Sequence, residues 1–288
     1  MSVAFLGLGN MGGPMAANLL AAGEKVTGYD PNPTARVEGI AVADSAAAAV
    51  KGADVVITML PSGRHVLDCY REIVPAAAPG TLFLDCSTIE VTDARAAAEL
   101  AAGHLALDAP VSGGVVGATA ATLTFMVGGP SEAFIAAEPY LKTMGKKIVH
   151  CGETGAGQAA KICNNMILGV SMIAVSEAFA LGRSLGLTDQ ALFDVASTAS
   201  GQCWALTTNC PVPGPVPTSP ANRDYTGGFA SSLMLKDLRL AQAAAQAGGV
   251  PTALGAHAEE LYAAFVEQDG SGRDFSAIIT SLTKDGPA

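Results

Sequence analysis

The sequence predicts an α/β protein in which a doubly wound, largely parallel sheet is followed by an all-helical region. Short β-branched runs alternate with Ala-rich helical stretches through the first 150 residues, which is typical of a sheet covered by helices on both faces. After about Gly152 the strand signal disappears and long helical stretches follow. We therefore expect one domain over residues 1–156 and an all-α C-terminal domain over residues 157–288, joined by a long interdomain helix.

Each strand of the first domain is predicted from an apolar run bounded by turn residues. These runs are Val3–Leu8, Lys25–Tyr29, Asp54–Met59, Thr81–Leu84, Leu105–Leu107, Leu123–Val127 and Lys147–His150. Helices are predicted between them at Met11–Ala22, Ser45–Lys51, Arg64–Glu72, Thr92–Ala102 and Ser131–Thr143.

The second domain begins with one long predicted helix over Gly157–Leu185, which Gly186 ends. Further helices are predicted at Asp189–Ala199, Ser231–Ala247, Ala253–Gln268 and Phe275–Thr283. The segment Cys210–Gly228 is rich in Pro and Gly and cannot be helical throughout, so we expect either a long ordered loop or a flexible lid.

Charge and composition exclude several classes of partner. The chain has 16 basic and 26 acidic residues and a net charge of −10, so it repels phosphate backbones and anionic headgroups. Neither of two long uncharged stretches, 109–131 and 195–222, forms the continuous apolar run of about 20 residues that a membrane helix needs. We expect no nucleic acid partner, no membrane partner and no signal peptide.

The six cysteines are dispersed, with no Cys-x-x-Cys pair, and the four histidines are isolated from one another. Dispersed thiols in a chain without a secretion signal are typical of reduced cysteines. The sequence therefore predicts a cytoplasmic protein and no metal site.

A glycine motif follows the first predicted strand and opens the first predicted helix. It places Gly7, Gly9 and Gly12 in the pattern G-x-G-x-x-G, with Asn10 and Met11 inside the turn. The first glycine permits the tight turn, the second lets the backbone approach a pyrophosphate, and the third permits close packing of helix and strand. The motif in this context predicts a Rossmann-type domain that binds a dinucleotide at the helix N-terminus.

Asp30 ends the second predicted strand, where an acidic side chain can bind both ribose hydroxyls of NAD. A 2′-phosphate at this point would meet a like charge, so we expect NAD as the cofactor, although Arg36 nearby leaves NADP open.

Further loops follow the next predicted strands and meet the same carboxyl edge of the sheet, where ligands bind. They contain Leu60 and Pro61, then Thr88, and then the run from Ser112 through Gly113 to Gly114. We expect the cofactor to contact Leu60, Pro61 and Thr88 across this edge.

Lys161 and Asn165 lie four residues apart near the start of the long helix, so their side chains share one helical face. A lysine removed from water loses its proton more readily and can act as a general base, and an amide one turn later can orient a hydroxyl. Oxidation of an alcohol by NAD needs such a base. The alternative is a surface lysine beside a packing asparagine.

Six motifs in this order resemble the β-hydroxyacid dehydrogenase family over nearly the whole chain. They are GLGNMGGPMAANLL, ITMLPSGRHV, LDCSTI, DAPVSGGVVGA, GAGQAAKICNN and GGFASSLMLKDL. The surroundings of Trp204 and the loop Asn209–Gly214 resemble the bacterial subgroup that oxidises 3-hydroxyisobutyrate.

The resemblance implies roles for individual residues. Lys161 matches the catalytic lysine of the family, and Asn165 its substrate-orienting partner. Ser112, Gly113 and Gly114 match the loop that holds the substrate carboxylate, and Trp204 lies in the region of the substrate pocket. Contacts with the cofactor are implied for three further residues: His65, Thr88 and Lys236.

The reaction implied is oxidation of 3-hydroxyisobutyrate by NAD to methylmalonate semialdehyde, a step of valine breakdown, in a homodimer or homotetramer. Serine, tartronate semialdehyde or another short 3-hydroxy acid remains an alternative substrate. A nucleotide-binding module without catalysis is the alternative from another class; the presence of Lys161 argues against it, and also against imine reductases, which typically lack this lysine.

Overall fold

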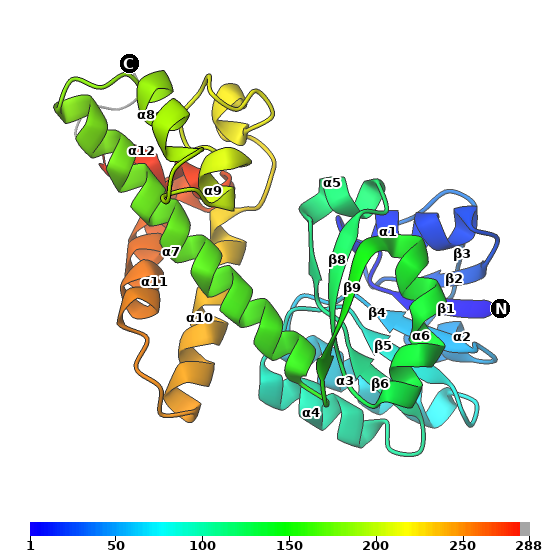
Figure 1. The fold of residues 1–288 in the computed structure, drawn as a ribbon. Helices are drawn as coiled ribbons and strands as arrows, with labels where there is room; N and C mark the ends of the chain where they lie inside the picture. Colours follow the sequence, from blue (N-terminus) through cyan, green and yellow to red (C-terminus); the bar gives the residue numbers. More distant parts are fainter. Residues whose placement is uncertain (283–288) are drawn as a thin grey trace. The chain divides into compact units, whose positions relative to one another are not determined.

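The computed structural model describes residues 1–282 and divides into two compact units, Met1–Lys161 and a second unit that begins at Ile162 (Figure 1). The helix α7 (Ala156–Ser184) continues from the first unit into the second. The domain boundary expected between residues 156 and 157 falls at the start of this helix.

The first unit is built on one mixed sheet with the strand order β3-β2-β1-β4-β5-β6-β8-β7, in which β9 pairs with β8 (Figure 1). The strands are β1 (Ser2–Leu6), β2 (Lys25–Tyr29), β3 (Ala41–Val42), β4 (Val55–Thr58), β5 (Leu82–Asp85), β6 (Leu105–Asp108), β7 (Val111–Ser112), β8 (Leu123–Gly128) and β9 (Gly145–Gly152). The strands from β3 through β6 are parallel, whereas β8 runs antiparallel to both β6 and β7. The order β3-β2-β1-β4-β5-β6 is that of a Rossmann sheet.

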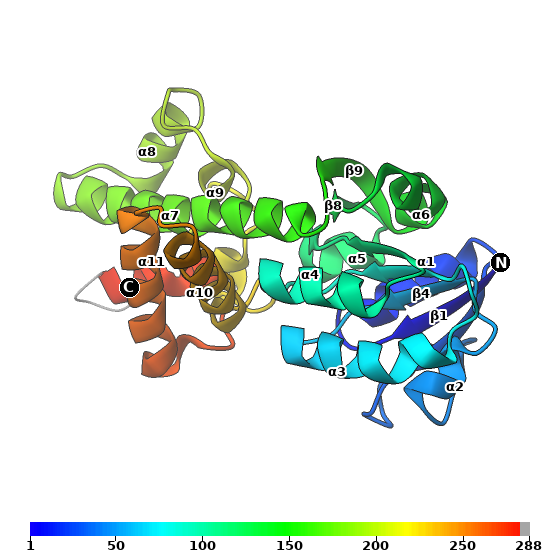
Figure 2. The same cartoon turned by 90° about the horizontal axis from the view of Figure 1, so that it is seen from below.

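Helices cover both faces of this sheet (Figure 2). They are α1 (Gly12–Ala21), α2 (Ala46–Val50), α3 (Gly63–Ile73), η1 (Val74–Ala76), α4 (Val91–Leu100), α5 (Gly114–Thr119) and α6 (Ser131–Met144). Alternate residues of one strand enter different cores: Val3 and Phe5 pack with α1 and α6, whereas Ala4 and Leu6 pack with α2, α3 and α4. Burial on both faces explains why the central strands are continuous apolar runs rather than alternating ones.

The predicted strands and helices of the first unit are present, with ends shifted by at most two residues. Four elements escaped prediction: β3 and β7, which have two residues each, the three-residue 3-10 turn η1, and α5. Such short pairings have no periodicity to detect, and α5 contains two glycines, Gly114 and Gly117, that oppose helix formation in isolation.

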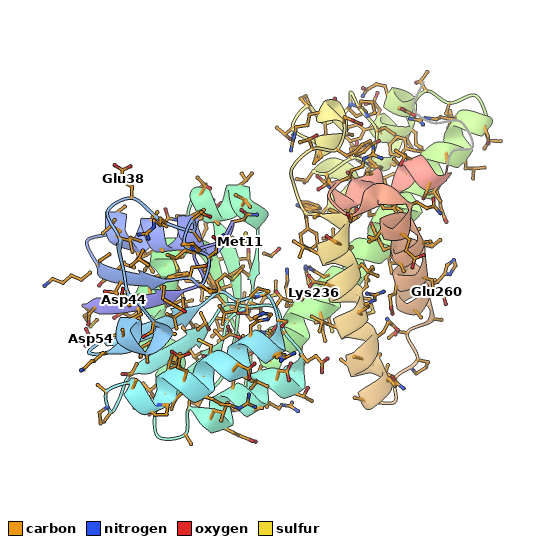
Figure 3. All side chains as sticks on the ribbon, turned by 180° about the vertical axis from the view of Figure 1, so that it is seen from behind. Met11, Glu38, Asp44, Asp54, Lys236 and Glu260 are labelled. Atoms are coloured by element: carbon orange, nitrogen blue, oxygen red, sulfur yellow. The ribbon has the colours of Figure 1, made fainter. Side chains whose placement is uncertain are left out.

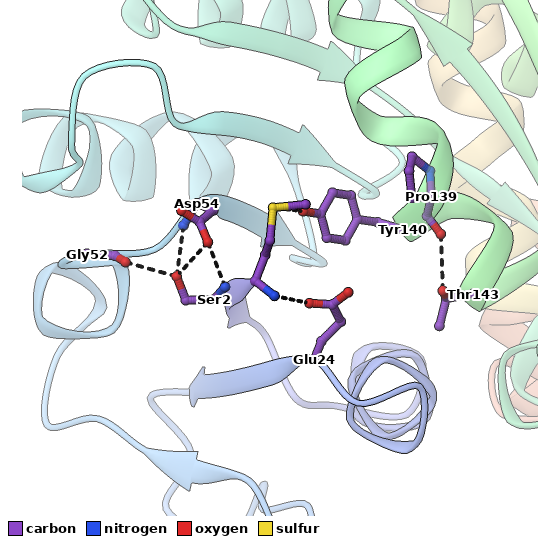
Figure 4. A network of polar contacts seen from close by, with 8 residues as sticks. Ser2, Glu24, Gly52, Asp54, Pro139, Tyr140 and Thr143 are labelled. Atoms are coloured by element: carbon purple, nitrogen blue, oxygen red, sulfur yellow. Dashed lines mark hydrogen bonds and ion pairs between the residues drawn. The ribbon is translucent and has the colours of Figure 1, made fainter.

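Polar contacts fix the start of β1 at the edge of the sheet opposite the glycine motif (Figure 4). The Met1 ammonium binds Glu24 at 2.9 Å, and the Ser2 backbone N–H donates to Asp54 at 2.8 Å. The Tyr140 hydroxyl of α6 donates to the Met1 sulfur at 3.4 Å. These contacts connect the start of β1 to the segments that precede its two neighbouring strands, β2 and β4, and to α6. They help to fix the register of β1, whose carboxyl end leads into the glycine turn.

In the part of the second unit that the structure describes, the regular elements are helices, and loops join them. After α7 it contains α8 (Asp189–Ala196), α9 (Trp204–Thr207), η2 (Pro220–Arg223), α10 (Ser231–Ala247), α11 (Ala253–Phe265), the π-helix η3 (Val266–Gly270), η4 (Phe275–Ile278) and α12 (Ile279–Leu282). Its core joins Met172 and Phe179 of α7 to Met234 and Leu238 of α10 and Tyr262 of α11.

Three helix predictions in this unit need correction. α8 ends at Ala196 rather than Ala199, and α11 ends at Phe265, where the chain continues as a π-helix through the predicted end. The single helix predicted over 275–283 is a 3-10 turn followed by α12, and its last residue lies outside the described residues.

The Pro-rich segment 210–228 is an ordered loop rather than a flexible lid. The Ser219 hydroxyl donates to the Cys210 carbonyl at 2.6 Å, and the Tyr225 hydroxyl donates to the Pro211 carbonyl at 2.9 Å. Val212, Val216 and Tyr225 lie in the core of the second unit. The loop is therefore held by its own polar contacts and by burial, as expected for one of the two alternatives that the sequence left open.

Among residues 1–282, α7 is the helix whose length and composition would suit a membrane span, with a mean hydropathy of 1.5 over its most apolar window. The core helix of a globular protein passes the same test. Met172, Ile173, Val175 and Phe179 of α7 lie in the core of the second unit, which accounts for much of its apolar character.

Candidate active site

The glycine turn lies where the strand order of the sheet reverses, next to β1 and β4. Gly7 has a φ of +95°, and a Cβ there would stand 2.3 Å from the Met59 carbonyl oxygen. A Cβ on Gly12 would stand 1.9 Å from the Gly7 carbonyl oxygen. Both positions therefore require glycine, because the turn passes against β4 and α1 packs directly on the turn.

Gly9 differs from the other two, because a Cβ built on it would meet no atom within 4 Å. It opens onto a cleft of about 640 Å³. The cleft is lined by Leu8, Gly9, Asn10, Gly13, Pro14, Ala17, Asn32, Thr34, Ala35, Arg36, Val37 and Glu38. Met11 is the N-cap residue of α1 (Figure 3). An open backbone turn at a helix N-terminus fits the pyrophosphate of a dinucleotide.

Asp30 follows β2 and is hydrogen-bonded to two residues that line this cleft, Leu8 and Asn32. Its carboxylate accepts the Leu8 N–H and the Asn32 N–H, each at 2.8 Å. Each carboxylate oxygen keeps a second lone pair, so the side chain can hold the turn and still accept ribose hydroxyls. Arg36 lines the same cleft and donates through Nε to the Pro33 carbonyl.

The loops after β4 and β5 are joined by the buried Ser87. Its hydroxyl accepts the Leu60 N–H at 2.8 Å and donates to Asp85 at 2.6 Å, and Asp85 also accepts from the Thr58 hydroxyl at 2.8 Å. Thr88 follows directly and is half-buried. These bonds bring two of the predicted cofactor-contacting loops together.

Pro61 and His65 lie at the exposed end of the same region. The His65 Nδ1 is 2.7 Å from the Ser62 hydroxyl at the start of α3. The helix and its cap therefore orient the imidazole at the carboxyl edge of the sheet, on the side where the cofactor contact is predicted.

Two buried carboxylates end neighbouring strands in register, Asp85 on β5 and Asp108 on β6. Burial raises the pKa of Asp85 to about 6 against the hydrogen bonds from Ser87 and Thr58, which lower it. Burial also raises the pKa of Asp108, which accepts the N–H groups of Gly155 at 2.7 Å and Gln158 at 2.9 Å. Asp108 thereby caps the start of α7 from another element of the sheet.

The substrate-carboxylate loop predicted at residues 112–114 leads from β7 into α5. Gly113 and Gly114 both have positive φ, +133° and +60°. A Cβ on Gly114 would meet no atom within 4 Å, so its backbone faces open space beside the half-buried Ser112. An open glycine backbone of this kind leaves room for an anion to approach.

Lys161 is 6% exposed on the second turn of α7, and Asn165 follows one turn later at 2%. The Asn165 amide donates to the buried carboxylate of Asp237 on α10 at 2.5 Å and accepts from the Asn164 amide at 2.9 Å. The carboxylate fixes which way the Asn165 amide points, so the asparagine is preset rather than free to rotate.

The remaining predicted residues lie in the second unit. Lys236 is half-buried on α10, directly before Asp237 (Figure 3). Trp204 is the first residue of α9 and is 52% exposed.

The sequence reasoning missed Asp108, Gln158 and Asp237, which hold the predicted residues in place. A usable signal existed for the first, because a charged residue that ends an apolar strand must find partners when it is buried. Gln158 and Asp237 carry no such signal, because a polar residue inside a helical run is usually solvated.

A Rossmann sheet with an open glycine turn, followed by a helix with a buried lysine, defines a dinucleotide-binding enzyme. Residues 2–152 match the family described as the NAD binding domain of 6-phosphogluconate dehydrogenase. Residues 155–282 match the family described as NAD-binding of NADP-dependent 3-hydroxyisobutyrate dehydrogenase. The cofactor is therefore a nicotinamide dinucleotide.

Relatives along the whole chain make the assignment more specific. A Mycobacterium tuberculosis protein described as probable 3-hydroxyisobutyrate dehydrogenase is 58% identical, over 98% of this chain and 97% of its own. A Pseudomonas aeruginosa NAD-dependent L-serine dehydrogenase is 49% identical over 96% of each chain. The solved Mycobacterium tuberculosis 3-hydroxyisobutyrate dehydrogenase with L-serine has a TM-score of 0.95 and 57% identity, with 98% of both chains covered. The chain belongs to the β-hydroxyacid dehydrogenase family, and these relatives are oxidoreductases of small 3-hydroxy acids.

Proposed function

We propose that this chain oxidises 3-hydroxyisobutyrate to methylmalonate semialdehyde with NAD as hydride acceptor, a step of valine breakdown. The observation that carries the proposal is the 58% identity, over 98% of the chain, to a relative described as probable 3-hydroxyisobutyrate dehydrogenase. We also propose a cytoplasmic location, which the six free cysteines support because thiols persist in a reducing compartment.

In this proposal the substrate carboxylate binds the Ser112 hydroxyl and the backbone amides of Gly113 and Gly114. The substrate hydroxyl then faces the Lys161 amine, and the Asn165 amide holds its orientation. Asp237 supports this step indirectly, because its bond to Asn165 presets the amide. Preset polar groups lower the cost of orienting the substrate at the moment of reaction.

The chemical step transfers a hydride from the hydroxyl-bearing carbon and a proton from its oxygen. NAD, when bound, accepts the hydride at its nicotinamide ring. Lys161 accepts the proton on its neutral amine and becomes an ammonium, while the carbon–oxygen bond becomes a carbonyl. In the reverse direction the same ammonium donates the proton, so Lys161 serves as general acid and base.

The preference for NAD over NADP rests on Asp30. In this proposal the carboxylate accepts the ribose hydroxyls and opposes a 2′-phosphate through like charge. Each oxygen that accepts the Leu8 or the Asn32 N–H keeps a second lone pair for a ribose hydroxyl.

L-serine is the second candidate substrate, because a 49% identical relative is an L-serine dehydrogenase and the similar solved structure was determined with L-serine. Serine carries an ammonium where 3-hydroxyisobutyrate carries a methyl group, so the two compete for one carboxylate and one hydroxyl position.

The deciding experiment measures kcat/KM for both enantiomers of 3-hydroxyisobutyrate and for L-serine, with NAD and with NADP. We expect the highest value for 3-hydroxyisobutyrate with NAD. A higher value for L-serine would replace the substrate and keep the reaction, whereas binding of NADH without turnover of any short 3-hydroxy acid would favour a non-catalytic module.

A further inference from the structure

Gln158 is completely buried on the first turn of α7 and uses both ends of its amide. Its Nε2 donates to the Ser87 carbonyl at 2.8 Å, and its Oε1 accepts the Ile89 N–H at 3.1 Å. The two bonds reach the backbone on either side of Thr88. Burial of an amide side chain costs free energy unless both its donor and its acceptor are hydrogen-bonded. Here the two hydrogen bonds hold the backbone on both sides of Thr88 and so fix that residue.

The backbone of Gln158 is held as firmly as its side chain. Its N–H donates to Asp108, which also caps Gly155. The intervening Gly157 has no room for a side chain, because a Cβ would stand 2.3 Å from the Met126 carbonyl oxygen. The start of α7 is therefore packed against the ends of β6 and β8 and cannot shift without breaking these contacts.

The same network continues to the loop after β4. Ser87, whose carbonyl accepts from Gln158, also accepts the Leu60 N–H through its hydroxyl and donates to Asp85. One chain of hydrogen bonds thus runs from the loop at Leu60, through the loop at Ser87, to the first turn of α7. Gln158 is the link that joins the two sheet loops to the helix.

Lys161 lies three residues after Gln158 on the same helix, so the two side chains share a face. We propose that Gln158 is the positioning residue that holds Lys161 in register with the cofactor-contacting loop 87–89, with Asp108 as its anchor. This inference rests on the proposed function, in which Lys161 takes the proton and Thr88 contacts the cofactor. A displacement of about 1 Å between reacting groups can lower a rate by roughly 100-fold, so such a link controls turnover without touching substrate.

The variant Gln158→Glu gives the sharpest test. A protonated glutamic acid can donate to the Ser87 carbonyl and accept the Ile89 N–H as glutamine does, whereas an ionised one can only accept. The carboxylate would then repel the Ser87 carbonyl, and burial raises the pKa of such a carboxyl group toward neutrality. We expect the ratio of variant to wild-type kcat to approach one at low pH and to fall roughly 10- to 100-fold as pH rises.

Several ionisable groups belong to the same surroundings: Asp108 on β6, Asp85 on β5, Lys161 on α7, and Arg95 of α4, whose Nε donates to the Thr154 carbonyl at 3.5 Å. The same groups are present in the wild type and in the variant, so the ratio of their activities at each pH removes the contribution that these groups make to both.

Two further variants separate positioning from stability. Gln158→Leu removes both bonds at every pH, so its kcat should be roughly 10- to 100-fold low with no pH-dependent recovery. Gln242→Leu is the matched control, a partly buried helical glutamine of the second unit that accepts from the Thr252 hydroxyl, and its kcat should stay near wild type. A ratio for Gln158→Glu that does not change with pH, or equal losses in Gln158→Leu and Gln242→Leu, overturns the inference.

A measurement of NADH affinity separates the test of the role of Gln158 from the test of the proposed function. If the wild type oxidises neither 3-hydroxyisobutyrate nor L-serine, the proposed function fails. NADH fluorescence then tests Gln158 alone, since release of loop 87–89 should weaken NADH binding by Gln158→Glu at high pH and restore it at low pH. Equal affinity of variant and wild type at every pH overturns the inference on this readout.

Discussion

Among the lysines of residues 1–282, Lys161 is the one whose side chain is buried, at 6% exposure. Lysine is almost never fully buried without a partner or a function, because the ammonium loses its hydration. The position on α7, the burial and the neighbouring Asn165 together support the proposed role of Lys161 as general acid and base, whereas any one of them alone would fit a structural lysine.

Replacement of Lys161 by alanine should lower kcat roughly 100- to 10,000-fold, because general-base catalysis contributes about that much. NADH affinity, measured by fluorescence, should remain within about threefold, since the loss falls on proton transfer rather than on binding. Lys161→Arg is the control, because it keeps the positive charge but cannot deprotonate, and it should be as inactive as the alanine variant. An alanine variant that retains turnover but loses NADH affinity would instead make Lys161 a cofactor ligand.

We propose that Asp30 governs the choice between NAD and NADP, and this proposal can also be tested at a single residue. Asp30→Asn should raise KM for NAD at least about tenfold and change KM for NADP much less, because a ribose acceptor is lost while the repulsion of a 2′-phosphate is relieved. Glu38→Gln is the control, because Glu38 is a charged residue of the cleft that does not lie beside the glycine turn. Its ratio of KM for NAD to KM for NADP should match that of the wild type. Steady-state kinetics with both cofactors checks this, and parallel effects of Asp30→Asn on NAD and NADP would contradict it.

At the scale of elements, β5 and β6 each end in a buried carboxylate at the carboxyl edge of the sheet, the edge where ligands bind in this class of fold. Burial raises the pKa of Asp85 in the folded state to about 6 from its ordinary value of 3.8, so the folded protein holds a proton that the unfolded chain has released. The free energy of unfolding should therefore fall as pH rises from about 4 to about 6, by roughly 1 to 3 kcal/mol, and then level off.

Asp85→Asn keeps an oxygen that accepts from Ser87 and Thr58 and removes the charge. Its unfolding free energy should lack this decline, and above pH 6 it should exceed that of the wild type. Urea unfolding at several pH values measures the difference, and Asp68→Asn, at an exposed position on α3, provides the control. A variant that keeps the wild-type slope would show that Asp85 does not titrate in this range.

The elements that could be predicted are those with a strong period or sharp ends. Five helices of the first unit and the long α7 lie where expected, because each run has Gly, Ser or Pro near one or both of its ends. The two-residue strands β3 and β7 exist because a neighbouring strand offers backbone partners, which no local pattern reveals. The π-helix after Phe265 continues the run that was predicted as helical, so it differs from the prediction only in being a π-helix rather than an α-helix.

For the candidate site, the sequence motifs predicted the residues that would contact ligands better than they predicted the residues that hold those ligand-contacting residues in position. The glycine turn, Asp30 and Lys161 have spacings that chemistry requires, so the sequence alone makes them recognisable. Asp108 and Gln158 act through partners separated by 47 to 71 residues along the chain, and only the folded sheet brings these partners together.

At the scale of the whole molecule, the second unit leaves many large apolar side chains in solvent. They include Ile167, Leu181, Leu185, Leu187, Val195, Leu233 and Leu254, each at least 47% exposed. In the most apolar window of α7 only 39% of the residues are buried. A large contiguous group of exposed apolar side chains usually marks an interface.

We therefore expect a homodimer or homotetramer of 28.8 kDa chains, in which α7 and its neighbours in the second unit bury these side chains against another copy. Light scattering coupled to size exclusion should give two or four times the chain mass at micromolar concentration. Leu181→Glu places a charge on α7, where Leu181 is 60% exposed, and should shift the protein toward smaller species. Val116→Glu, at a 78% exposed position of the first unit, should leave the mass unchanged. A monomeric wild type under these conditions would contradict the expectation, and dissociation by both variants alike would move the interface away from α7.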